Sequence, residues 1–394
     1  MPSGQPPHVP GRRIKAYDSG MEGAPEQAER PRLSVCITTR DRPELLASCL
    51  SSLLAQESAP PFELLVSCQG TPVAAEVVDA LFPDATVGFV DGAHCGGARN
   101  FLVERSRGEW LLFLDDDVTC PSDLLASFVS IIDAHPNTDV VGGPNVTPDG
   151  SPLFEQVQGS VLSSFFATGP IRARYGAHRS GPADERSFNL CNLAIRRSVM
   201  VPFPSENVGG EETVVLSELA RRGVRMHYDP SVAVAHARRP SLGQFARQIY
   251  KYGFGRGEAF VCHPNTRRTI HALPLLLIGW FVALPALAIL VSPLFLASLG
   301  IYAAFVAAGG VRIGLTSTVH GLARVRYAVT AMTLIVLVHL TYGVGLIGGM
   351  IRRRRIPPSA WVDHRPHRAA DLQQPAPSLE GLATLRAADA GSSS

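Results

Sequence analysis

Two long apolar segments near the end of this 394-residue chain restrict most strongly what it can fold into. Residues 272–310 are almost entirely apolar, and residues 327–351 form another such segment. About 20 residues of helix cross a bilayer, so the first segment predicts two crossings and the second is a further candidate. A buried pair of core helices is the alternative, but the unbroken apolar length favours insertion. We expect a membrane region at 270–351 with two to three helices.

Basic residues around these segments bear on orientation. Those near the first two crossings are Arg267, Arg268, Arg312, Arg324 and Arg326. All of them agree with a cytosolic start and a cytosolic return of the chain. A third crossing would place Arg352–Arg355 outside, against the positive-inside trend, unless one segment is re-entrant or interfacial. Residues 352–394 are predicted to form this basic flank and, after it, a disordered tail. The basic flank is either a membrane anchor or a solvated cluster.

The remaining composition excludes several classes of protein. Residues 1–30 are rich in Pro, Gly and charge and lack the apolar core of a signal peptide, so we expect a disordered tail. The net charge of +2 provides no general attraction for nucleic acid. The seven cysteines contain no CxxC pair, which favours reduced thiols in the cytosol over a disulfide scaffold or a zinc site.

Short strand-like runs alternate with helical patterns from residue 33 to residue 134. Strands are expected at 33–39, 62–68, 86–90 and 110–114, and helices at 44–55, 73–81, 96–107 and 123–134. This alternation predicts an α/β fold with a parallel sheet, in which ligands bind at the carboxyl ends of the strands. Residues 147–187 are rich in Gly, Pro and Ser, and we expect an irregular excursion near the site there, or a poorly ordered loop.

Three consecutive aspartates, Asp115, Asp116 and Asp117, follow the fourth strand. Adjacent carboxylates repel one another and are tolerated when a cation neutralises them. Their hard oxygen ligands suit Mg²⁺ or Mn²⁺, ions that also bind diphosphates. A solvated turn that caps the next helix is the alternative.

Three motifs in this order resemble the family 2 glycosyltransferases over about residues 33–257. Ser34–Arg42, which includes Thr38, Arg40 and Asp41, is similar to the family's first strand and donor-binding loop. Gly96–Asn100 resembles its G-x-A-R-N stretch, and Asp115–Asp117 resembles its D-x-D motif. The resemblance implies a GT-A type nucleotide-binding domain at 31–262, with a parallel-dominated sheet flanked by helices and C-terminal transmembrane helices.

The resemblance also implies roles on the donor side. Asp117 would bind the metal, and Asp115 would contact the nucleotide side of a nucleotide-sugar donor, with Asp116 beside them. Arg99 and Asn100 would lie near the donor, although Arg99 can equally form a structural salt bridge. After the second strand the family commonly carries an acidic pair that holds the nucleotide base, and this pair is absent here. Gln69 can hydrogen-bond the nucleotide base in its place. The identity of the nucleotide is therefore open, and a UDP-sugar is only the default donor.

The acceptor side depends on Glu211 and Glu212, which stand where family members carry the general base. The resemblance implies an inverting transfer to a hydroxyl, with Glu212 aligned to the base and Glu211 open as the alternative. The alternative is that Glu211 and Glu212 are acidic residues stabilised by the dipole at the N-terminus of a helix. His236 resembles a histidine near the diphosphate or metal, and it can instead be structural. Gln248, Lys251 and Tyr252 resemble part of the Q-x-x-R-W motif of processive members.

The segment 252–257 is similar to the one before the membrane helices of exopolysaccharide members such as succinoglycan-type transferases. We therefore expect a multi-pass cell-membrane enzyme with a cytosolic catalytic domain and a lipid-linked or cell-envelope glycan acceptor. Transfer to polyprenyl phosphate and a non-catalytic membrane scaffold are the alternatives. A transporter is disfavoured, because the apolar segments are few and their interiors carry no charged pathway.

Overall fold

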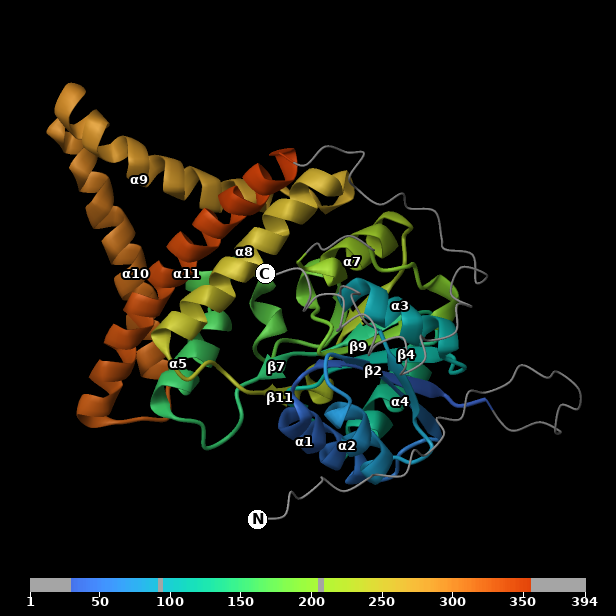
Figure 1. Ribbon diagram of the computed structural model, residues 1–394. Coiled ribbons are helices and arrows are strands. Elements are labelled where there is room, and N and C mark those ends of the chain that lie inside the picture. The colour runs from blue at the N-terminus through green and yellow to red at the C-terminus, as the bar shows by residue number, and fades with distance from the viewer. Residues whose placement is uncertain (1–29, 91–94, 205–208, 356–394) are drawn as a thin grey trace, which may run out of the picture. The chain divides into compact units, whose positions relative to one another are not determined.

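The computed structural model describes residues 30–90, 95–204 and 209–355 (Figure 1). The tails predicted at 1–30 and beyond 355 lie outside the described residues, apart from Arg30. Pro31 and the described residues after it belong to one structural unit.

A large sheet of eight strands forms the centre of the part predicted to be catalytic, residues 31–262 (Figure 1). Its strands are β1 (Leu33–Arg40), β2 (Phe62–Gln69), β3 (Thr86–Phe89), β4 (Trp110–Asp115), β6 (Val140–Gly142), β8 (Gly181–Ala183), β9 (Asn192–Arg196) and β10 (Met226–Tyr228). The order is β3-β2-β1-β4-β9-β6-β10-β8, with β9 and the edge strand β8 antiparallel to their neighbours. The other pairings are parallel, so the predicted parallel-dominated sheet is confirmed.

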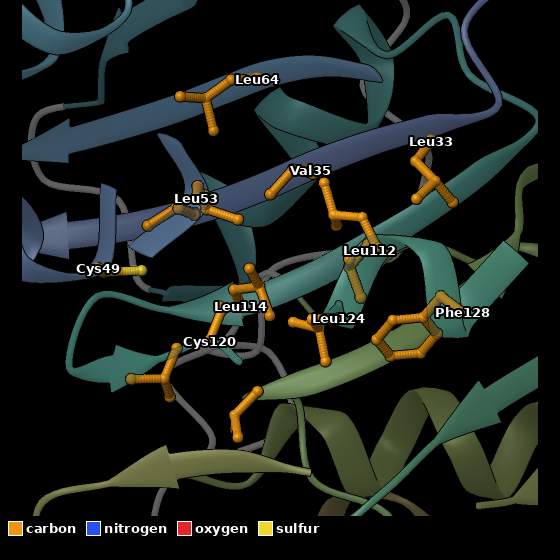
Figure 2. Close-up of a cluster of buried hydrophobic side chains, with 14 of the residues drawn as sticks. Leu33, Val35, Cys49, Leu53, Leu64, Leu112, Leu114, Cys120, Leu124 and Phe128 are labelled. Carbon is orange, nitrogen blue, oxygen red and sulfur yellow. The ribbon is translucent and has the colours of Figure 1, made fainter. Parts of the chain in front are cut away.

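Helices cover both faces of this sheet. Helices α1 (Pro43–Leu54), α2 (Val73–Leu81) and α4 (Leu124–Ala134) cover one face, and α3 (Cys95–Arg105) and α7 (Glu211–Arg221) cover the other. Successive side chains of a strand point to opposite faces. Accordingly, Leu112 of β4 packs in a cluster with Phe128 of α4, as Figure 2 shows, whereas Phe113 packs with Leu102 of α3. Because these strands are buried on both faces, their sequences are continuous runs of apolar residues.

A small second sheet carries the end of the aspartate turn. It consists of β5 (Val118–Thr119), β11 (Val234–His236) and β7 (Asn145–Val146), in that order. In the antiparallel pair of β5 and β11, His236 lies opposite Val118. The register therefore places His236 directly beside Asp117, although 119 residues separate the two along the chain.

The expectation of an irregular stretch at 147–187 is wrong. That stretch contains α5 (Leu153–Leu162), α6 (Phe165–Thr168) and short 3-10 helices at Gly169–Arg174 and Glu185–Ser187. Val157 and Val161 of α5 are fully buried in a cluster that also contains Leu334 and Ile335. The Gly, Pro and Ser content of this stretch indicates loops. The prediction failed because composition does not reveal that α5 packs against another helix.

Four long helices end the described chain (Figure 1): α8 (Leu242–Cys262), α9 (Ala272–Leu290), α10 (Ala297–Thr316) and α11 (Gly321–Arg355). Among the residues that the structure describes, three segments are long and apolar enough to cross a membrane: Thr269–Leu290, Pro293–Thr316 and Gly321–Arg353. Large apolar side chains on α9 and α10, such as Val282 and Ile301, are about three-quarters exposed. Their exposure fits a lipid environment.

Helices α8 and α11 pack backbone against backbone through glycines. A Cβ atom at Gly253 would lie 2.2 Å from the carbonyl oxygen of Tyr342, and one at Gly349 would lie 2.0 Å from that of Phe254. Gly257 and Gly345 are equally close to the opposite helix. The small-xxx-small spacing on both helices permits this approach.

Another face of α8 touches the segment that leads into α7. A Cβ atom at Gly255 would lie 2.3 Å from the carbonyl oxygen of Gly209. Glu258, one turn further along α8, is 2 % exposed and accepts a 3.4 Å hydrogen bond from the Gly209 N–H. Arg352 and Arg353 also donate to Glu258, so Arg353 is buried against α8 instead of solvated.

Candidate active site

The three aspartates lie where β4 ends and the chain turns into β5. Asp115 is the last residue of β4 and is paired in register with Thr38 of β1. Asp116 is buried and accepts a 2.7 Å hydrogen bond from the hydroxyl of Thr39. Arg42 Nη1 lies 3.2 Å from Asp116 Oδ1 and 3.1 Å from Asp117 Oδ2. Arg42 thus partly neutralises the turn.

His236 completes this acidic cluster. Its Nε2 lies 3.1 Å from Asp117 Oδ1, and its Nδ1 lies 2.9 Å from the carbonyl oxygen of Ala237. A carbonyl only accepts hydrogen bonds, so Nδ1 carries the proton. Burial lowers the pKa of His236, but the hydrogen bond and charge of Asp117 outweigh it and raise that pKa, so Nε2 also carries a proton and donates it to Asp117. The Nε2 lone pair becomes available to a cation when that proton leaves.

Asp115, Asp117 and His236 each offer one ligand atom, and these atoms lie within 4.8 Å of one another. Burial raises the pKa of Asp115 to about 6, although Arg99 opposes the shift. Burial also raises the pKa of Asp117, but the hydrogen bond and charge of His236 outweigh it and hold that pKa at about 2. Two carboxylates and an imidazole are a donor set that suits a divalent cation such as Mn²⁺.

Arg99 of α3 joins this cluster to α7. It forms an ion pair with Glu211, and its Nη2 lies 3.7 Å from Asp115 Oδ1. The next residue, Asn100, exchanges hydrogen bonds of 2.9 and 2.8 Å with the carbonyl and the N–H of Phe203. The side chain of Asn100 therefore holds the chain before α7.

Glu211 and Glu212 are the first residues of α7. Gly210 precedes them with φ = +83°, a left-handed conformation that favours glycine. Glu211 is engaged by Arg99, whereas the nearest basic contact of Glu212 is Arg174 Nη1, at 3.9 Å from its Oε1. Glu212 is therefore the less constrained of the two carboxylates.

One cavity of about 770 Å³ is lined both by residues of this site and by residues of the long C-terminal helices. Of the predicted site residues, its wall includes Arg99, Asp115, Glu212, His236, Lys251 and Tyr252. The wall also includes Leu273 and Leu277 of α9, Phe305 of α10, and Val338 and Tyr342 of α11. The residues predicted for the donor and for the base thus line the same cavity as apolar side chains of the long C-terminal helices.

The donor-loop residues lie at the carboxyl ends of β1 and β2. Arg40 Nε donates a 2.9 Å hydrogen bond to the Gln69 side-chain oxygen, and the two residues are paired in register. Asp41, with φ = +51°, accepts a 2.8 Å hydrogen bond from the Thr71 N–H. These contacts order the two loops at the end of the sheet where ligands bind.

The three residues predicted from α8 lie on its N-terminal half. Gln248 donates a 2.9 Å hydrogen bond to the Tyr252 hydroxyl, and Lys251 and Tyr252 reach the cavity. Sequence reasoning missed Arg42, Arg174 and Arg256 as candidate site residues. Arg42 lies in the motif Ser34–Arg42 and Arg256 lies in the segment 252–257, so both motifs could have indicated them. Arg174 lies in the stretch 147–187, which was expected to be irregular.

Residues 34–200 match the family model described as Glycosyl transferase family 2. No curated protein matches the chain. Among solved structures, the mannosyltransferase PcManGT from Pyrobaculum calidifontis, in complex with GDP-Man and Mn²⁺, is 18% identical over 84% of this chain and 89% of that chain, with a TM-score of 0.49. Residues 1–349 of S. aureus TarS are 16% identical over 82% and 92%, with a TM-score of 0.39. The family match contains the aspartate turn and Arg99 but ends before Glu212 and His236.

Proposed function

We propose that this glycosyltransferase, whose residues 34–200 form a family 2 domain with a GT-A-like α/β fold, transfers a sugar with inversion from a nucleotide-sugar donor to a hydroxyl of a lipid-linked or cell-envelope glycan. A UDP-sugar is the first donor to test. The observation that carries the proposal is the single cavity in whose wall Asp115, Glu212 and apolar side chains of α9–α11 occur together.

Asp117, Asp115 and His236 would hold Mg²⁺ or Mn²⁺ beside the donor diphosphate. The fit is supported by the spacing of their ligand atoms and by the hydrogen bond from Nδ1 to Ala237, which leaves Nε2 of His236 available. When bound, the ion neutralises negative charge on the departing nucleoside diphosphate. Arg42 and Arg99 contribute positive charge on either side of the same turn.

Glu212 is the proposed general base. It accepts the proton of the acceptor hydroxyl while that oxygen forms a bond to the anomeric carbon, and the bond from this carbon to the diphosphate oxygen breaks with its electron pair on that oxygen. Attack opposite the leaving group inverts the anomeric centre. Glu211 is the weaker candidate, because Arg99 holds its carboxylate in an ion pair.

The membrane arrangement we propose has two crossings, α9 and α10. Helix α11 contacts the catalytic part near both ends, through Tyr327 to Ser160 at 2.8 Å and through Arg353 to Glu258 at 3.1 Å. These contacts are 26 residues apart, or about 40 Å of helix at 1.5 Å per residue. A helix attached over that length stays on the side of the catalytic part, which we place in the cytosol. Arg352–Arg355 then obey the positive-inside trend.

A donor screen tests the proposal. Membranes that contain the full chain are incubated with individual nucleotide sugars and Mg²⁺ or Mn²⁺, and release of the nucleoside diphosphate is measured. We expect consumption of one donor, loss of at least about 100-fold in rate for Asp117→Asn, and no loss for Asp149→Asn, a control at an exposed aspartate. Consumption of no donor, or an Asp117→Asn variant as active as wild type, would contradict the proposal.

A further inference from the structure

The cavity changes character between the catalytic residues and the membrane helices. Its wall contains Arg174, Arg256 and His271 as well as Leu273 and Leu277. Arg174 lies 3.9 Å from Glu212, and the charge of Arg256 acts on both Arg174 and His271, so these groups lead from Glu212 towards the start of α9. Cationic groups between a polar centre and an apolar surface match the build of an amphiphile with an anionic headgroup. Such a ligand can bind only cations that the protein's own carboxylates do not already neutralise.

Arg174 and Arg256 are only partly neutralised. Arg174 is 6 % exposed, and its Nε donates to the Arg186 carbonyl at 2.8 Å. Its nearest carboxylate, that of Glu212, is 3.9 Å away. Burial lowers the pKa of Arg174, and the neighbouring charge of Arg256 lowers it further. Within the described residues Arg256 forms no ion pair or hydrogen bond.

His271 provides an independent indication of a ligand. Its side chain is among the cavity wall residues and is 8 % exposed, yet its Nδ1 is buried without a hydrogen-bond partner in the described part of the chain. An unsatisfied buried polar atom destabilises the folded state, so native proteins rarely retain one without a bound partner. Arg268, three residues earlier, is by contrast already paired with Glu185 at 2.7 Å.

We propose that this part of the cavity binds the phosphate of the acceptor lipid. The inference rests on the proposed transferase function and adds the acceptor's chemical class: a lipid phosphate or diphosphate that carries the sugar to be extended. Arg174 and Arg256 donate to the phosphate oxygens, and His271 supplies a further polar contact. The lipid chain follows Leu273 and Leu277 into the bilayer, and the acceptor hydroxyl reaches Glu212.

Direct binding tests this assignment without any donor. The full chain in detergent is titrated with dodecyl phosphate, dodecanol and inorganic phosphate, and Kd is measured by microscale thermophoresis. We expect dodecyl phosphate to bind at least about tenfold more tightly than either of the others. Equal binding of dodecanol would overturn the phosphate site, and equal binding of inorganic phosphate would overturn the lipid as its source.

Substitutions locate the site. Arg256→Gln is expected to raise the Kd for dodecyl phosphate about tenfold or more and to leave the Kd for dodecanol unchanged. Arg247→Gln, an exposed arginine on the same helix, is the matched control and is expected to bind like wild type. Arg174→Gln is a second variant at the site. An unchanged Kd in both Arg256→Gln and Arg174→Gln would overturn the proposal, whereas a wild type that consumes no nucleotide sugar would contradict the transferase function instead.

Discussion

Glu258 of α8 and Arg353 of α11 form an ion pair with 3.1 Å between Oε1 and Nε, and their side chains are only 3 % and 7 % exposed. Arg352 contacts the same carboxylate oxygen, and the other oxygen faces the Gly209 N–H. A single buried carboxylate thus joins the end of the last helix to the segment before Glu212.

Glu258→Gln is expected to destabilise the protein by about 3–5 kcal/mol, because a neutral amide replaces the buried carboxylate that pairs with the Arg353 guanidinium. The measurement is the thermal unfolding midpoint of the purified chain in detergent. Glu104→Gln is the control, since Glu104 belongs to an exposed pair with Arg105 and its loss should cost less than about 1 kcal/mol. Equal midpoints for the two variants would refute a stabilising role for the buried pair.

Gly253→Ala is expected to weaken the packing of α8 on α11. The added Cβ would lie 2.2 Å from the Tyr342 carbonyl oxygen, so the two backbones must separate, at a cost of about 1–3 kcal/mol. Gly243→Ala on the same helix meets no atom within 4 Å and should be neutral or slightly stabilising. Unfolding midpoints measured side by side check this contrast, and a Gly253→Ala variant as stable as Gly243→Ala would show that the contact is not tight.

Glu212→Gln is expected to lower kcat for a hydroxyl acceptor by about 10²–10⁴-fold, because the general base is lost while the shape of the side chain is kept. Glu211→Gln should have the smaller effect on kcat, since its proposed role is to hold Arg99. Initial rates at saturating donor and acceptor distinguish them. If Glu212→Gln retains transfer to a lipid phosphate but loses transfer to hydroxyls, the phosphate itself is a competent nucleophile; the reverse ranking of the two variants would assign the base to Glu211.

Asn100→Ala is expected to destabilise the fold by about 1–3 kcal/mol, because it removes both hydrogen bonds to the Phe203 backbone. The resemblance instead predicts contact with the donor. The KM for the nucleotide sugar discriminates the two roles: a structural residue changes the unfolding midpoint with little change in KM, whereas a donor contact raises KM even at temperatures where the variant is fully folded.

Cysteine labelling examines the membrane arrangement. In a background with Cys95→Ser and Cys262→Ser, Ser292→Cys should react with a membrane-impermeant maleimide from outside sealed right-side-out vesicles. Arg355→Cys should react only after permeabilisation, because α11 remains attached to the cytosolic catalytic part. Labelling of Arg355→Cys from outside would demonstrate a third crossing.

The fold could be predicted further than the site. The strand that ends in Asp115 is apolar on both faces, and this local property is sufficient to predict a buried parallel strand before three carboxylates. The meeting of Asp117 with His236 depends instead on β5 and β11, which are two and three residues long. Strands this short have no periodicity to detect, and only the resemblance indicated His236.

The last helices show a different limit of sequence reasoning. Residues 327–351 are apolar whether they face lipid or protein, so composition could not distinguish a crossing from a helix packed on α5 and α8. Arg174 was missed for a related reason: its neighbours in the sequence resemble a loop, and the contacts of that stretch with α10 and α11 cannot be seen in its composition. The glycines of α8 were visible, but their role requires a second helix at the right distance.

The glycine contacts of α8 have a mechanical consequence. Backbone meets backbone on one side, at α11, and again on the other side, at Gly209, with no flexible side chain in between. A movement of α11 is therefore transmitted to the start of α7. Because α11 also packs against α9 and α10, and the tilt of these two crossing helices follows the thickness of the bilayer, we expect the rate of this enzyme to vary with lipid chain length.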